Sequence, residues 1–147
     1  LDIYPAKGYS ATLPVLDATK APQVSLTDDE YKLVYSRFGD RLRVAGTAEL
    51  NGYGMALNPV RCEALVRRTL ELFPGVSDPA RVLFWTGLRP ATPGNVPYIG
   101  PSRVQGLFLN TGHGTLGWTH GCGSGRALAD LMSGRRPEVD FRFQGMA

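Results

Sequence analysis

The sequence has few of the residues that bind metals or form disulfides. It contains two cysteines, Cys62 and Cys122, and two histidines, His113 and His120. Two isolated cysteines make neither a disulfide framework nor a zinc-ligand set, so both are expected to be small core residues in a reducing compartment. The histidines have no paired carboxylates near them in the sequence, and no metal site is therefore predicted.

Long apolar runs and a strong charge of one sign are also missing. No run approaches the roughly 18 residues of a membrane-spanning helix, although a peripheral contact with a membrane surface stays open. The net charge of +3 comes from 16 basic and 13 acidic residues that are spread along the chain, so no nucleic-acid partner is expected. The 147 residues, 43% of them hydrophobic, are enough for a globular core.

The first third of the chain is typical of antiparallel strands. Apolar and polar residues alternate, and the pattern predicts strands over residues 6–14, 23–27, 31–38 and 41–50. Gly39-Asp40 separates the last two runs and predicts a hairpin with a two-residue turn.

A single amphipathic helix follows. Asn58 and Pro59 are typical of an N-cap and a first helical residue, and Pro74-Gly75 ends the pattern. The residues of the apolar stripe fall at helical spacing: Cys62, Leu65, Val66, Thr69, Leu70 and Phe73. We expect this helix to lie on the sheet, with its arginines at the surface.

The last third is predicted to contain two strands and a helix. An apolar run over 81–90 predicts a strand, and the proline-containing segment 91–101 predicts an extended connector without regular structure. A short strand over 106–110 then leads through a glycine-rich bend into a helix from Cys122 to Ser133.

Residues 111–119 of this bend are the first candidate for a binding site. A strand, a bend and a helix start bring free backbone N–H groups together, which favours an anion or the negative end of a dipole. Gly112, Gly114 and Gly117 would allow a ligand to approach the backbone closely. A tight turn without a ligand is an equally good interpretation of glycine content alone.

Arg89 is the first candidate for substrate binding. It ends an apolar strand and is followed by Pro90, so its planar guanidinium would be presented to a carboxylate or a phosphate. The alternative is an arginine that points to water. We expect His113 to act through its backbone rather than as a base, and His120 to be a helix residue. No Gly-x-Ser-x-Gly motif supports a serine hydrolase.

Three segments resemble the FAD-dependent D-amino-acid oxidase superfamily. They are Trp85–Pro93, Pro97–Gly100 and Asn110–Thr119. Within that superfamily, Tyr4–Ser10 and Arg37–Gly46 are most similar to the bacterial D-amino acid dehydrogenases. In that family a Gly-x-Gly-x-x-Gly fingerprint near the N-terminus, with its strand, begins the flavin domain; that N-terminal fingerprint and strand are absent here, so the resemblance implies the C-terminal part of such an enzyme.

The resemblance implies an α+β fold and a flavin-dependent reaction. Residues 1–90 would be the C-terminal portion of a substrate domain, an antiparallel sheet with a covering helix. Residues 91–147 would add the connector and the last strand and helix of a Rossmann-like FAD domain. The implied activity is oxidation of D-amino acids to 2-oxo acids and ammonia, with hydride transfer to flavin N5. Electrons would pass to a respiratory acceptor such as a quinone, in the cytoplasm or at the inner membrane.

The resemblance also implies roles for single residues. Arg89 would bind the substrate carboxylate, and Tyr9 and Tyr53 are candidate pocket aromatics. The residues that would contact the pyrimidine end of the flavin are Gly112, His113, Gly114, Thr115, Leu116, Gly117, Trp118 and Thr119. Gly94 departs from the aspartate usual in the family.

Two alternatives stay open. One is a related flavoenzyme that acts on glycine, sarcosine or a 2-hydroxy acid. The other is a non-catalytic substrate-binding domain.

Overall fold

The computed structural model describes residues 1–139 and divides the chain into two compact units. One unit is Ala6–Leu88, and the other combines Leu1–Pro5 with the residues from Arg89 onward. The expected domain division into 1–90 and 91–147 stays a prediction about the whole protein.

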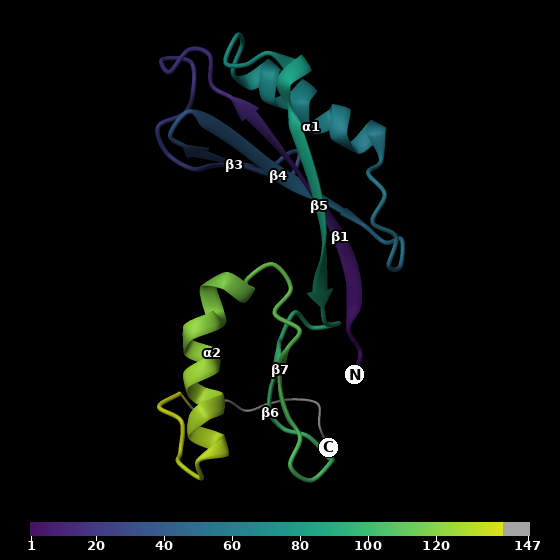
Figure 1. The fold of residues 1–147 in the computed structure, drawn as a ribbon, viewed down its shortest axis with the longest axis vertical. Coiled ribbons are helices and arrows are strands. Elements are labelled where there is room, and N and C mark those ends of the chain that lie inside the picture. The colour runs from purple at the N-terminus through teal and green to yellow at the C-terminus, as the bar shows by residue number, and fades with distance from the viewer. Residues whose placement is uncertain (140–147) are drawn as a thin grey trace. The chain divides into compact units, whose positions relative to one another are not determined.

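The first unit is built on an antiparallel sheet (Figure 1). Its strands are β1 (Tyr4–Pro14), β2 (Leu26–Asp28), β3 (Leu33–Phe38), β4 (Arg41–Glu49) and β5 (Leu83–Ala91). The first two residues of β1 and the last three of β5 belong to the second unit. They lie in the order β2-β3-β4-β1-β5, and the pairs β2–β3, β3–β4 and β1–β4 are antiparallel. The expected antiparallel sheet is therefore confirmed.

The β3–β4 hairpin has the predicted two-residue turn. Phe38 pairs with Arg41, which leaves Gly39 and Asp40 as the loop. Gly39 has a φ of 60°, a conformation that glycine adopts without a side-chain clash. The turn residues thus fix the register in which the two strands bury Leu33, Tyr35, Leu42 and Val44.

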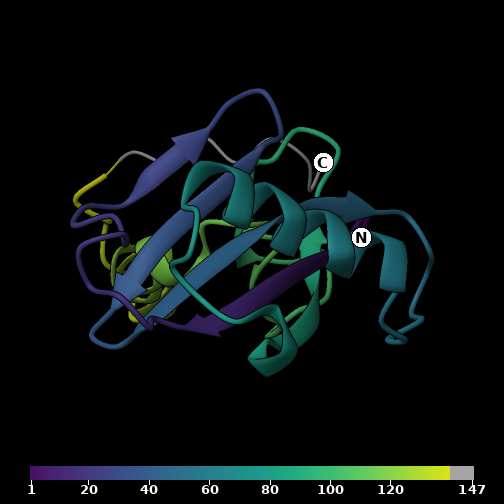
Figure 2. The same cartoon turned by 90° about the horizontal axis from the view of Figure 1, so that it is seen from above.

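Helix α1 (Pro59–Leu72) covers one face of this sheet, as Figure 2 shows. The side chain of Asn58 accepts a hydrogen bond from the Val60 N–H at 3.1 Å, which confirms the predicted N-cap. Cys62, Leu65 and Thr69 are the buried residues of the helix. They pack with Tyr9, Ala11, Leu13 and the buried residues of the β3–β4 hairpin, so the core lies between α1 and the sheet.

Three features of this unit differ from the expectations. Strand β2 begins at Leu26, later than predicted, and a short 3-10 helix, η1 (Pro79–Arg81), precedes β5. Arg68, expected at the surface, is mostly buried because its Nε lies 2.6 Å from Asp28 Oδ2 and its guanidinium stacks on the Tyr31 ring. This ion pair links the end of β2 to α1. Helical periodicity could not predict it, because the partner Asp28 lies on a strand outside the helix.

The second unit contains a two-stranded antiparallel sheet and helix α2. Strand β6 (Tyr98–Pro101) pairs with β7 (Phe108–Thr111), and α2 spans Gly117–Met132. The expectation that 91–101 lacks regular structure is wrong at its C-terminal end. Pro97 and Pro101 favour extended backbone around them, and β7 supplies hydrogen-bond partners for that backbone.

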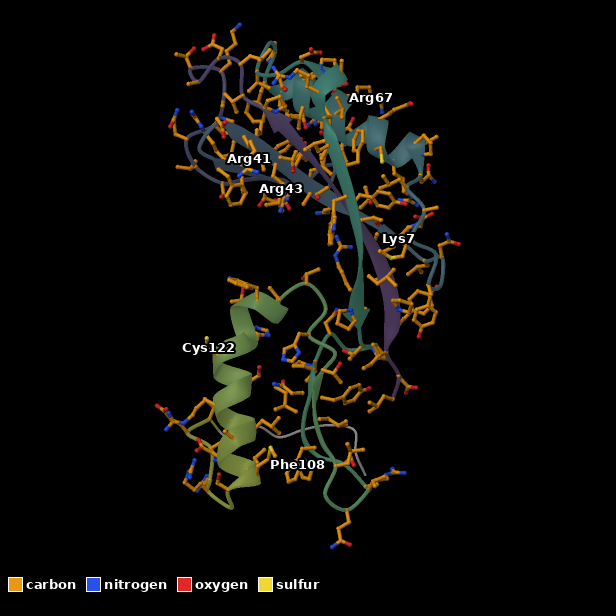
Figure 3. All side chains as sticks on the ribbon, in the orientation of Figure 1. Lys7, Arg41, Arg43, Arg67, Phe108 and Cys122 are labelled. Atoms are coloured by element: carbon orange, nitrogen blue, oxygen red, sulfur yellow. The ribbon has the colours of Figure 1, made fainter. Side chains whose placement is uncertain are left out.

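Helix α2 begins at Gly117, earlier than the predicted Cys122. Its first residues include Gly117 and Gly121, which add no apolar side chain to the pattern from which the start was predicted. Cys122 is exposed and lies on the side of α2 away from β6 and β7, so its predicted core position is wrong (Figure 3). Cys62 is buried as expected. Neither helix of the described chain is long and apolar enough to cross a bilayer.

Candidate functional site

Arg89 lies near the C-terminal end of β5 and is followed by Pro90. Its side chain is half-buried, and this burial lowers the pKa of the guanidinium from its ordinary value. The guanidinium nevertheless stays protonated at neutral pH, since the ordinary pKa of arginine lies far above neutrality. A partly desolvated, permanent cation of this kind attracts a carboxylate more strongly than one in open water.

A backbone hydrogen bond joins the end of β5 to the glycine-rich bend. The Gly114 N–H donates to the Pro90 carbonyl at 3.0 Å. Both residues belong to the same unit, so the bond fixes the bend beside the residue that follows Arg89. The structure thereby brings together the two sequence-predicted features, the arginine and the bend.

The bend itself is shaped by Gly112. This residue has a φ of 82° and is buried, and a Cβ placed on it would lie 2.6 Å from Thr92 Cγ2. The Thr92 hydroxyl in turn donates to the Val96 carbonyl at 3.0 Å. Glycine is therefore required here both by the backbone conformation and by the close approach of the connector.

The start of α2 leaves backbone donors available. Leu116 is the N-cap residue, and its side chain makes no capping hydrogen bond. The N–H groups of Gly117, Trp118 and Thr119 precede the first intrahelical donor, His120, which bonds to the Leu116 carbonyl at 2.9 Å. Leu116, Trp118 and Thr119 are exposed, with Trp118 99% exposed. Within residues 1–139, this helix start offers amides that no intrahelical hydrogen bond uses, together with the positive end of a helix dipole.

His113 lies at the centre of the bend. Within residues 1–139 its buried Nε2 has no hydrogen-bond partner, and its ring centroid is 6.2 Å from that of His120. Burial, followed by the charge of His120, lowers the pKa of His113. The ring is therefore neutral at pH 7. The expectation that His113 acts through its backbone rather than as a base stays a prediction.

Tyr9 and Tyr53 belong to the other unit, Ala6–Leu88. Tyr9 is 2% exposed, and its hydroxyl donates to Glu49 Oε2. Tyr53 is 80% exposed on the loop after β4. The two tyrosines thus have different surroundings, and their assignment to a substrate pocket stays a prediction.

Lys7 is the residue that the sequence patterns left out. It is 1% exposed and pairs with Glu49, with its Nζ 2.8 Å from Glu49 Oε2. The sequence does indicate that Lys7 is buried, because residues 7, 9, 11 and 13 share one face of β1 and the other three are apolar or aromatic core residues. A lysine at an inward position of such a strand indicates a buried partner. Among residues 1–139, no group of histidine, cysteine and acidic side chains could hold a metal ion.

Comparison with known proteins shows the family to which this chain belongs. Residues 1–131 match the model of the FAD dependent oxidoreductase family. The chain belongs to this family. Membership confirms the expected family and its FAD cofactor. The amides at the start of α2 and the glycine at residue 112 fit the binding of a flavin.

Relatives with high identity cover almost the whole chain. The D-amino acid dehydrogenase of Dechloromonas aromatica (strain RCB) is 64% identical over 143 residues, which are 97% of this chain and 34% of that protein. That of Methylobacterium radiotolerans is 56% identical over 139 residues, or 95% of this chain and 33% of that protein. The chain spans about a third of the length of the curated relatives it matches.

A solved structure supports the fold. Glycine oxidase from Geobacillus kaustophilus superposes with a TM-score of 0.84 at 22% identity, covering 99% of this chain and 40% of that one. At this identity the likeness concerns the fold alone, and it confirms the expected α+β class.

Proposed function

We propose that this chain is the C-terminal part of an FAD-dependent D-amino acid dehydrogenase. The observation that carries the proposal is the 64% identity to a protein of that name along nearly the whole chain. The enzyme would oxidise D-amino acids to 2-oxo acids and ammonia. The substrate would lose a hydride from its α-carbon and a proton from its amino group, and water would then hydrolyse the imino acid.

Arg89 would bind the substrate carboxylate. Its half-buried position supports the role because a charge-assisted hydrogen bond to a carboxylate is stronger where the guanidinium is partly shielded from water. A planar guanidinium can also hold both carboxylate oxygens, which would fix the orientation of the α-carbon. Positioning of this kind matters more than acid–base catalysis for a hydride transfer.

Residues 112–119 would hold the pyrimidine end of the flavin. Bound FAD would supply the hydride acceptor, with negative charge near its C2 carbonyl in the reduced state. The amides of Gly117, Trp118 and Thr119 support this assignment, since they lie at the positive end of α2 without a side-chain cap. Because His113 is neutral, the helix amides and not an imidazolium would stabilise the negative charge of the reduced flavin.

The remaining partners belong to the same proposal. Tyr9 and Tyr53 are assigned to the substrate pocket. Tyr53 would contact the substrate with its exposed side chain, whereas Tyr9 is 2% exposed and would act by holding Glu49, to which its hydroxyl donates. The relatives are named dehydrogenases rather than oxidases, which supports an acceptor other than dioxygen, such as a membrane quinone. Contact with the inner membrane would then be peripheral.

The decisive test is flavin reduction in the full-length protein that contains this segment. Under anaerobic conditions, D-alanine should bleach the visible absorption of the flavin far faster than sarcosine or 2-hydroxyglutarate does. Reduction by sarcosine, glycine or 2-hydroxyglutarate alone would favour the related oxidoreductases. If no D-amino acid reduces the flavin, the proposed activity is wrong. Reoxidation by a soluble quinone compared with dioxygen would test the acceptor separately.

A further inference from the structure

Strand β4 carries an extra residue where it pairs with β1. Lys7 pairs with Glu49 and Tyr9 with Gly46, so Thr47 and Ala48 together lie opposite Gly8. Thr47 has a φ of 57°, which is unfavourable for a β-branched residue. A β-bulge of this kind changes the direction of the side chains around it, and strain of this kind persists only where the surroundings impose it.

A buried cluster of three side chains lies beside the bulge. Lys7 Nζ is 2.8 Å from Glu49 Oε2 and 5.4 Å from the centre of the Tyr9 ring. The Tyr9 hydroxyl donates to the same Glu49 oxygen. Lys7 and Tyr9 are 1% and 2% exposed, and Glu49 is 16% exposed. A buried ammonium is unfavourable unless it is paired, so these contacts are required for Lys7 to occupy this position.

The ammonium of Lys7 makes one more contact, with a distant part of the chain. It donates to the carbonyl of Ala56 at 2.9 Å. Glu49 ends β4, and Ala56 lies just before the Asn58 cap of α1, so the ammonium holds both ends of the segment between them. We call this segment, residues 50–57, the 50–57 loop. Figure 3 labels Lys7 on β1, beside this loop.

The middle of the 50–57 loop is exposed. Tyr53 is 80% exposed and Met55 51% exposed, whereas Lys7, whose ammonium closes the base of the loop, is 1% exposed. Loops whose ends are held together while their tips face solvent commonly present functional side chains.

We propose that Lys7 is a positioning residue that closes the base of the 50–57 loop, so that the loop holds Tyr53, assigned to the substrate pocket in the proposed function, as part of one preformed unit. The closure of the loop stands on the contacts of Lys7 alone. Its link to the substrate rests on the proposed function.

The cluster is charged over the whole neutral range. Glu49 raises the pKa of Lys7 above 10.5, although burial opposes this. Lys7, and then the Tyr9 hydroxyl, lower the pKa of Glu49 below 4.5, and Arg61 acts in the same direction. Closure of the loop therefore does not depend on pH between these values.

Amide hydrogen exchange of the 147-residue chain tests the closure. In Lys7→Met, the ammonium is lost at nearly constant side-chain length, and the amides of 51–56 should exchange at least ~10-fold faster, a local opening of the kind that exchange detects. The amides of the β3–β4 hairpin should keep their rates. The control is Lys32→Met, whose ammonium is 77% exposed and 3.5 Å from Asp29, and it should leave the 50–57 loop unchanged.

Two outcomes would overturn the closure. The first is an unchanged exchange rate for the amides of 51–56 in Lys7→Met. If Lys7→Met does not fold, Glu49→Gln is used instead, because it removes the charge and keeps the size. The same amides should then exchange faster, and unchanged rates would be the second contradicting outcome.

Kinetics of the full-length flavoenzyme test the link to Tyr53 separately. Lys7→Met and Tyr53→Ala should both raise KM for the D-amino acid that reduces the flavin, with unchanged flavin absorption. A loop that opens without any change in KM would leave the closure intact and refute the link. If no D-amino acid is oxidised, the proposed function fails, and hydrogen exchange still decides the role of Lys7.

Discussion

The Gly114 N–H donates to the Pro90 carbonyl at 3.0 Å, and this bond joins the glycine-rich bend to the strand that carries Arg89. Each partner is a backbone group, so the bond does not depend on any side chain of the bend. The predicted carboxylate and flavin positions are therefore coupled through the main chain, and changes in either should affect both.

Arg89→Met should strongly impair the full-length enzyme. Removing one partner of a desolvated, hydrogen-bonded charge pair costs about 2–5 kcal/mol, so kcat/KM should fall about 30-fold to about 4,000-fold. Arg89→Lys should restore only part of this loss, because an ammonium cannot hold both carboxylate oxygens in one plane. Steady-state kinetics with a D-amino acid would measure kcat/KM for both variants.

The matched control for Arg89 is Arg67→Met on α1. Arg67 is 72% exposed, and its Nε is 3.9 Å from Glu71, so kcat/KM should not change. An Arg89→Met enzyme with the activity of the Arg67→Met enzyme would contradict the assigned role.

Gly112→Ala should destabilise the chain. The new Cβ would lie 2.6 Å from Thr92 Cγ2, and the residue would keep a φ of 82° that costs an L-residue roughly 1–2 kcal/mol before any clash. Thermal unfolding should show a Tm lower by several degrees.

Gly125→Ala provides the contrasting variant for Gly112. Gly125 lies within α2, and a Cβ there would meet nothing within 4 Å, so alanine should stabilise the helix by up to about 1 kcal/mol. Equal Tm shifts in the two variants would show that the bend does not require glycine at residue 112.

His113 should titrate below the ordinary histidine range. Burial and the neighbouring His120 lower its folded pKa, whereas the unfolded chain keeps the usual value near 6.5. The unfolded state therefore binds the proton more readily, and the contribution of His113 to stability is full above about pH 6.5 and is lost as pH falls toward the folded pKa. Imidazole chemical shifts from pH 4 to 8 would measure the pKa, and an ordinary value would contradict the burial of Nε2.

The matching stability experiment uses His113→Gln. Urea unfolding of the parent chain should show falling stability on acidification through this window, and the variant should show a smaller fall. Equal slopes for the two proteins would assign the effect to other groups.

The 147-residue chain alone should retain little or no FAD. It offers amides for one end of the flavin, but its one run with Gly-x-Gly-x-x-Gly spacing, Gly112–Gly117, is the bend assigned to the pyrimidine end, and no second such run is present for the pyrophosphate. After purification with added FAD and desalting, the visible spectrum should lack a flavin band. A yellow chain with a stoichiometric band would show that residues 112–119 suffice for binding.

Local chemistry made several elements predictable from the sequence. Gly39-Asp40 and Asn58-Pro59 act within a few residues, and both the hairpin turn and the helix cap were predicted at the correct positions. Alternation located β1, β3 and β4 because one face of each packs on the core.

Long-range partners explain what was not predicted. Strand β6 exists because β7 pairs with it, and Arg68 is buried because Asp28 reaches it from β2. The early start of α2 depends on glycines, which have no side chain to show a periodicity. For the site, Arg89 and the bend were identified from local patterns, whereas their connection through Gly114 and Pro90 depends on the fold.

Thr47 has a consequence for protein engineering. Its φ of 57° suits glycine or asparagine better than threonine, and relief of the strain is worth roughly 1–2 kcal/mol. A library randomised at residue 47 and selected only for thermal stability should therefore be enriched in glycine and asparagine. The same library can be selected for turnover in the full-length enzyme. A lower enrichment of glycine and asparagine at residue 47 in that selection would measure how far stability and catalysis compete at this backbone position.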